Sequence, residues 1–209
     1  MNMLPVIRGK NIAGCPALLN RSTFKVPFRA DPLKSTVITV RNVDSRRVNP
    51  WSWEFLDFKQ IGSVLAEPSN EVAAKPGEYL FAAVDQSGEV QGRITFFLHG
   101  RRRHYGIHID HLDTAPHNNW RTTHYRPDIA LKGIGPILIG SAVQMHFRAV
   151  LEVYDDKRVV TVDSHFESAD FYEKIGMKHH WFFYTHFAFT GAQASDFLVK
   201  LCYKFAHFS

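Results

Sequence analysis

A glycine pair in the second half of the chain constrains the fold more than any other feature. The residues run Lys132-Gly133-Ile134-Gly135-Pro136 and continue into the apolar run Ile137-Leu138-Ile139, directly after a strand-like segment and a loop. Glycine has no Cβ, so backbone N–H groups at such a turn can face a ligand. The helix that we expect to follow adds the positive end of its macrodipole. The stretch therefore predicts a turn and a helix whose first amides form a seat for a diphosphate.

Length and composition favour one globular domain. The chain has 209 residues, of which 45% are apolar, and this is enough for a sizeable core. Residues 1–35 are rich in Pro, Gly, Arg and Asn and are interpreted as an N-terminal arm, with residues 36–209 as a single domain. No apolar run reaches transmembrane length and the N-terminus does not have the pattern of a signal peptide, so we expect a cytoplasmic protein with no membrane partner. The net charge of +5 fits an anionic coenzyme and also weak contact with nucleic acid.

The periodicity of the chain predicts strands and helices in a mixed order. We expect strands at 37–40, 79–84, 90–98, 105–114, 158–163 and 177–189, and helices at 49–65, from the glycine turn to about 151, at 167–175 and at 192–208. This order predicts a mixed α/β layer in which the helix after the glycine turn forms the crossover that follows the fourth strand.

Three segments of the chain, taken in order, resemble the GNAT superfamily of N-acetyltransferases. A strand ends in Leu112-Asp113-Thr114-Ala115-Pro116, the glycine turn follows, and Phe171-Tyr172-Glu173-Lys174-Ile175-Gly176-Met177 comes later. The family pattern is a strand ending Leu-x-Val-x-Pro, then Arg/Gln-x-x-Gly-x-Gly/Ala, then Phe-Tyr-x-x-x-Gly-Phe. The resemblance covers residues 37–190. It implies a GNAT-like fold, with a central, mostly antiparallel sheet that is splayed between strands 4 and 5 and flanked by helices.

The resemblance also implies an activity. It is acyl-CoA-dependent N-acyltransfer, in which an acetyl group passes from acetyl-CoA to a primary amine by direct attack in a ternary complex, without a metal. Strand 4 would pair with the pantetheine arm of the coenzyme, and the glycine turn would hold its pyrophosphate. Pro136 has no N–H, so the turn offers one donor fewer at that position. The residues expected at the coenzyme are Leu112, Asp113, Thr114, Lys132, Gly133, Ile134, Gly135, Pro136 and Ile137.

Three side chains are candidates for catalysis. Tyr172 matches the tyrosine that family members aim at the coenzyme sulfur as a general acid, and its structural alternative is a core ring. His108 and Asp110 stand where family members place a Glu or a His facing the amine. Histidine titrates near neutrality, which suits a base, and Asp110 would orient it or position a water. Strand alternation would put His108, Asp110 and Leu112 on one face, although a bulge would shift one of them.

The segment from His117 to Leu131 is longer than the corresponding family connection. Its side chains Trp120, Arg121, His124 and Tyr125 predict a lid or a wall for the substrate. The histidines of this region do not have the spacing of a zinc site, so no metal is expected.

Two other functions stay open from the sequence alone. One is a CoA-binding or interaction module without turnover. The other is a toxin-like acetyltransferase that acts on aminoacyl-tRNA, suggested by the basic charge and by Arg101-Arg102-Arg103. We expect a small-molecule or peptide amine as the acceptor and regard nucleic acid as the less favoured partner. The aromatic C-terminal strands leave a homodimer open.

Overall fold

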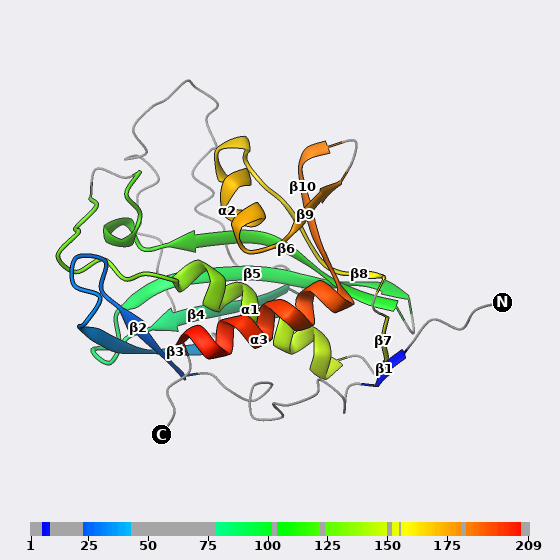
Figure 1. Cartoon of the computed structure of the whole chain (residues 1–209), viewed down its shortest axis with the longest axis horizontal. Helices are drawn as coiled ribbons and strands as arrows, with labels where there is room; N and C mark the ends of the chain where they lie inside the picture. The colour runs from blue at the N-terminus through cyan, green and yellow to red at the C-terminus, as the bar shows by residue number, and fades with distance from the viewer. Residues whose placement is uncertain are drawn as a thin grey trace.

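A computed structural model describes residues 6–8, 23–42, 78–101, 104–121, 124–149, 152–154, 156–180 and 183–205 (Figure 1). Its main unit is an eight-stranded sheet with the order β2-β3-β4-β5-β6-β8-β10-β9. The strands of this sheet are β2 (Thr23–Pro27), β3 (Ser35–Asn42), β4 (Glu78–Val84), β5 (Val90–Arg101), β6 (His104–Thr114), β8 (Arg158–Asp163), β9 (Lys178–His180) and β10 (Phe183–Thr190). Strands β1 (Val6–Arg8) and β7 (Glu152–Tyr154) form a separate antiparallel pair.

Within the main sheet, all described neighbours are antiparallel except β6 and β8, which are parallel. The connection between these two strands carries α1 (Ile134–Ala149). The expected mixed α/β fold, with a mostly antiparallel sheet flanked by helices, is therefore confirmed.

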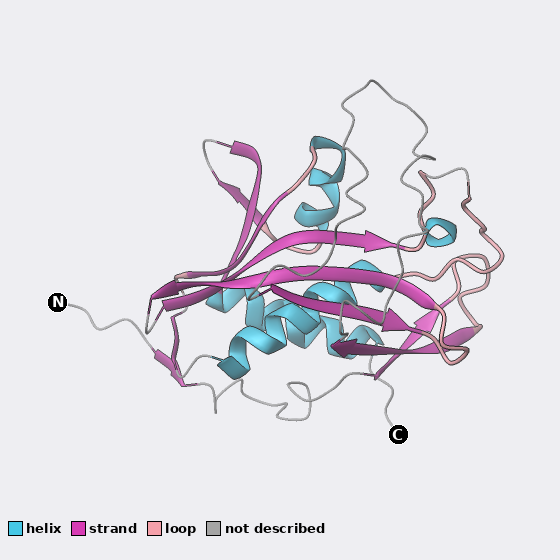
Figure 2. Cartoon of the chain, turned by 180° about the vertical axis from the view of Figure 1, so that it is seen from behind, coloured by secondary structure: helices cyan, strands magenta, loops and turns pink. Residues whose placement is uncertain are grey.

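The core lies between one face of the sheet and two long helices. Helix α1 packs against β4, β5, β6 and β8, and α3 (Gly191–Phe205) packs against α1 and β10. Figure 2 shows the sheet in front of both helices from the opposite side. The fully buried side chains of Phe96, Ile109, Leu138 and Phe187 come from four different elements and belong to one cluster. No helix in the described part of the chain combines the length and apolarity needed to cross a membrane.

Short helices lie beside the main sheet. The 3-10 turns η4 (Pro116–Asn118) and η5 (Phe166–Ser168) follow β6 and β8, and η5 leads into α2 (Ala169–Lys174). Gly176 follows α2 with a φ of 97°, a conformation that favours glycine and ends the helix.

Two expectations about the elements are wrong. Residues 23–27, which the sequence analysis placed in the N-terminal arm, form β2 and pair with β3. The predicted strand 177–189 is instead two strands, β9 and β10, that pair antiparallel with each other. The helix expected at 49–65 lies outside the described residues.

Candidate functional site

The sheet opens between β6 and β8. Their parallel pairing covers only Ile107 to Ile109 of β6, opposite Val160 to Val162 of β8. Strand β6 continues to Thr114, and in the described part of the chain residues 110–114 pair with β5 alone. One edge of β6 is thus left with backbone groups that pair with no other strand among the described residues. The opening lies at the expected position, between the fourth and fifth strands of the sequence analysis.

A β-bulge in β6 lies at the start of this opening. Thr95 of β5 pairs with His111 and the next residue, Phe96, pairs with Ile109, so Asp110 is an extra residue on β6. A bulge reverses the alternation of side chains that follows it. The expectation that His108, Asp110 and Leu112 share a face is therefore wrong. Leu112 pairs with Ile94 on the core face, while His108 shares the opposite face with His111 and Asp113.

His108 sits among polar side chains on the face away from α1 and α3. Its Nδ1 lies 3.0 Å from Thr161 Oγ1, and its Nε2 lies 3.8 Å from Asp163 Oδ2. Asp163 also hydrogen-bonds His186 Nδ1. Sequence reasoning missed Asp163 and His186. The signal that could have found Asp163 is its place at the end of a strand that runs parallel to the strand of His108.

His99 of β5 also lies close to His108. The two rings lie 6.5 Å apart, and Phe97 lies 5.1 Å from the His108 ring. Burial lowers the pKa of His99, and the proximity of His108 lowers it further. No group of three or more His, Cys, Asp or Glu side chains suited to hold a metal ion is found within the described residues.

Asp110 and Asp113 have different partners. Asp110 Oδ2 lies 3.2 Å from His111 Nε2, and the structure does not pair Asp110 with His108. Asp113 Oδ2 accepts a hydrogen bond of 2.7 Å from Nε of the buried Arg93. The side chain of Asp113 is therefore held by Arg93 of β5. What β6 can offer to a ligand is the backbone of residues 112–114.

Tyr172 approaches from the core face of the sheet. It lies on α2 with 6% of its surface exposed, and its ring stacks on Phe187 at 5.4 Å. Phe187 pairs with Val162, whose neighbour Ile109 is on the core face, so Tyr172 and His108 lie on opposite faces of the sheet. Burial raises the pKa of Tyr172 to about 12, and the charge of Asp113 adds to this effect. The phenol therefore keeps its proton at neutral pH.

The glycine turn begins α1 as expected. Gly133 has a φ of 101° and α1 starts at the next residue, with no acidic side chain in its first turn. The Ile137 amide donates to the Gly133 carbonyl at 3.1 Å, and the Lys132 amide donates to the Pro27 carbonyl at 3.0 Å. Since Pro136 has no N–H, the amides of 133–135 remain as the donors that this turn can direct at an anion. The Lys132 side chain is exposed beside them.

Two aromatic rings explain why glycine is needed at this turn. A Cβ at Gly133 would lie 2.3 Å from Phe205 of α3, and one at Gly135 would lie 3.0 Å from Phe171 of α2. The turn thus holds α2 and α3 close to the start of α1, in addition to any contact with a ligand.

The segment from His117 to Leu131 leads from the end of β6 to the start of α1, and one of its side chains contacts the residues just before α2. Arg121 donates from Nη2 to the Glu167 carbonyl at 2.6 Å, and its guanidinium lies 5.2 Å from the centre of the Trp120 ring. Trp120 and His124 are exposed, and Tyr125 is half-buried. Arg121 and Trp120 therefore lie beside η5, which leads into α2, and their part in a lid or a substrate wall stays a prediction.

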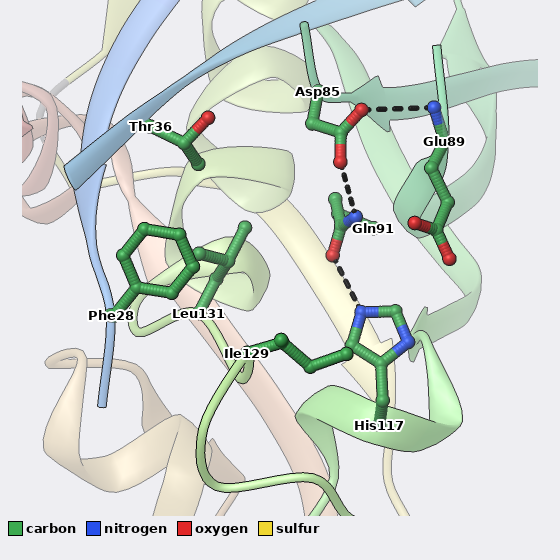
Figure 3. A pocket seen from close by; sticks show the side chains of 8 residues that line it. All are labelled: Phe28, Thr36, Asp85, Glu89, Gln91, His117, Ile129 and Leu131. Carbon is green, nitrogen blue, oxygen red and sulfur yellow. Dashed lines mark hydrogen bonds between the residues drawn. The ribbon is translucent and has the colours of Figure 1, made fainter. Parts of the chain in front are cut away.

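A separate cavity of about 200 Å³ lies between this segment, β2, β3 and the turn from β4 to β5 (Figure 3). Asp85, Gln91 and His117 form a chain of hydrogen bonds along its wall, with distances of 2.8 Å on both sides of Gln91. Buried Asn118 also donates to Gln91 Oε1 and accepts from the Leu131 amide. These hydrogen bonds connect the segment 117–131 to the start of β5. Burial lowers the pKa of His117.

Comparison with known proteins gives a likeness of fold. A protein from Exiguobacterium sp. 255-15, provisionally assigned as an acetyltransferase, has a TM-score of 0.50 and 20% identity over 76% of this chain and 97% of its own. An aminoglycoside acetyltransferase from an uncultured soil metagenomic sample has a TM-score of 0.39 and 15% identity over 66% of this chain and 86% of its own. No protein-family model matches the sequence, and no curated protein matches it significantly. The first likeness shows a shared fold.

Proposed function

We propose that this protein is a GNAT-type N-acyltransferase that transfers an acetyl group from acetyl-CoA to a primary amine by direct attack in a ternary complex. One observation carries the proposal: β6 and β8 separate after three paired residues, and the connection between these two strands contains α1, which begins with bare amides. The likeness of fold to the Exiguobacterium protein supports the proposal.

The chain offers groups that fit two parts of the coenzyme, the pantetheine arm and the pyrophosphate. The free edge of β6 at 112–114 suits the amides of a pantetheine arm, as a further strand would. The amides of 133–135 at the start of a 16-residue helix suit a pyrophosphate, and Lys132 adds a positive charge beside them.

His108 is our candidate for the base. A lysine-like amine is protonated at neutral pH, so it must lose a proton before it can attack the thioester. His108 would take this proton first, directly or through a water. As the neutral amine then forms the C–N bond and the C–S bond breaks, the second proton that the nitrogen loses would pass through solvent to the leaving thiolate. Its place on the face away from α1 and α3 puts the acceptor amine on that face. Asp110, which contacts His111, lies at the edge of the same gap and would position the water.

Tyr172 acts at the other side of the gap. With a pKa of about 12, its hydroxyl is protonated at every pH at which the enzyme would work. A thiol of ordinary pKa near 8.5 is the stronger acid by roughly three units, so complete transfer of the phenol proton to the thiolate is unfavourable. Tyr172 therefore stabilises the leaving thiolate chiefly as a hydrogen-bond donor.

The test is release of free thiol from acetyl-CoA over a panel of amines, together with calorimetric titration of CoA. We expect binding and amine-dependent release in the wild type. His108→Ala and Tyr172→Phe should each lower kcat while CoA still binds, and Tyr203→Phe, at an exposed position of α3, should change neither. Absence of CoA binding by folded protein would refute the proposal. Binding without release on any amine would leave a CoA-binding module instead.

A further inference from the structure

We infer that Asp163 and His186 are positioning residues for His108, which they hold as a base with its Nε2 nitrogen free to take a proton. The chemical role rests on the proposed function, but the arrangement of the three side chains can be tested without any activity.

Thr161 determines which nitrogen of His108 is basic. The Thr161 hydroxyl donates to the Ile107 carbonyl at 3.4 Å, so its oxygen is left to accept a hydrogen bond. We therefore place the ring proton of neutral His108 on Nδ1, which lies 3.0 Å from the Thr161 oxygen and would donate to it. The neutral ring then has its lone pair on Nε2. Parallel pairing of His108 with Thr161 places the two side chains side by side on one face.

Asp163 faces that lone pair without occupying it. Its Oδ2 lies 3.8 Å from Nε2, which is too long for a hydrogen bond and short enough for an ion pair once the ring is charged. A proton delivered to Nε2 by the amine or by a water is thus stabilised by a carboxylate that does not compete for it. Asp163 is two residues beyond Thr161 on β8 and shares its face.

His186 fixes the carboxylate of Asp163. The two residues are register partners across β8 and β10, and His186 Nδ1 donates to the oxygen Oδ1 that does not face His108. The side chain of Asp163 is 66% exposed and that of His186 27%, so Asp163 without this bond would be free to turn into solvent. The hydrogen bond keeps Oδ2 directed at His108.

Other charged groups also face His108 and limit the size of the effect. His99 from β5 disfavours a second positive charge nearby, and its pKa is lowered in part by His108. Asp110 and His111 lie further along β6 and contact each other. Since the Asp163 carboxylate is exposed to solvent, we expect its effect on the reaction to be modest.

The experiment follows His108 by long-range ¹H–¹⁵N NMR of histidine-labelled protein, with thiol release measured against pH in parallel. In the wild type at neutral pH, His108 should show a protonated Nδ1 and an unprotonated Nε2. Asp163→Asn should lower kcat and move the acid limb of the pH–rate profile to lower pH, because the carboxylate that faces Nε2 is lost. His186→Gln should give a smaller shift in the same direction, and Asp163→Glu should restore most of the effect.

Asp156→Asn is the matched control, because it removes one exposed carboxylate from the same half of the chain without facing His108. An inactive wild type with the expected tautomer and NMR shifts would refute the proposed function and keep this arrangement. An active wild type whose acid limb moves equally in the Asp163→Asn and Asp156→Asn variants would overturn the inference. A protonated Nε2 in the neutral ring would overturn it as well.

Discussion

Lowering the pH from 7 to 5 should destabilise this protein through one buried histidine, His146. The side chain lies on α1 and is 1% exposed, with its ring 5.6 Å from that of Phe147. Neither ring nitrogen has a hydrogen-bond partner among the residues that the structure describes. Burial lowers the pKa of His146 from 6.5 to about 4, with a smaller contribution from His99. The folded protein therefore keeps this ring neutral under conditions in which the unfolded chain protonates it.

The size of the effect follows from linkage. Between pH 6.5 and about 4 the unfolded state binds more protons than the folded state, so stability is lost as the pH falls through this window and is unaffected well above it. The full difference in pKa corresponds to about 3 kcal/mol, at 1.36 kcal/mol per unit. The part that falls between pH 7 and pH 5 is about 2 kcal/mol.

The assay is urea unfolding of the wild type and of His146→Leu at pH 7 and pH 5. Both proteins share the other titrating groups, including His99 and His117, so the difference between their losses of stability isolates His146. We expect the wild type to lose about 2 kcal/mol more than the variant. The variant should also be no less stable at pH 7, because it no longer buries two unpartnered nitrogens. Equal losses in the two proteins would show that the reasoning about this ring is wrong.

Three further changes test the packing around the site, each by urea unfolding or hydrogen exchange. Gly133→Ala adds a Cβ 2.3 Å from a phenylalanine ring at a φ of 101° and should cost about 3 kcal/mol, whereas Gly88→Ala, with a similar φ and open space, should cost about 1 kcal/mol; equal costs would exclude the clash. Asn118→Ala leaves a buried amide without its acceptor and should cost about 2 kcal/mol, while Arg126→Ala, in an exposed ion pair, should change stability little. Arg121→Ala should speed hydrogen exchange in residues 117–131 without changing the unfolding midpoint, and unchanged exchange would show that this contact does not hold the segment.

The features that the sequence predicted well are those set by local chemistry. Gly133 precedes a helix because the turn needs a positive φ and the apolar run that follows has helical character, and Gly135 lies in the first turn of that helix. The strands that became β4 and β5 flank a turn in which Asp85 accepts from three groups of Ser87 and Glu89, which is typical turn chemistry. Such signals come from residues close in sequence, so no tertiary information was needed to read them.

The features that the sequence missed depend on distant partners or on weak local signals. The β2 strand lies in a segment that resembles an arm in composition, although its alternation of buried Phe24 and Val26 was a readable signal. No Gly, Pro, Asn or Asp marks the break between β9 and β10. The contact of Asp163 with His108 arises from the parallel pairing of two strands that lie about fifty residues apart, which no local pattern records.

The extra residue at Asp110 has a consequence for anyone who compares this chain with others of similar fold. Because of this residue, each side chain from 111 to 114 projects to the face of the sheet opposite to the one that strict alternation from His108 would assign. Deleting Asp110 would leave Leu112 facing α1 and Asp113 facing the gap, because the pairing beyond the bulge keeps its register, whereas regular pairing with Asp110 retained would exchange the two environments. A strand of the same length without a bulge can therefore carry the same residue types in inverted roles, and equivalent residues have to be matched by the direction in which they project.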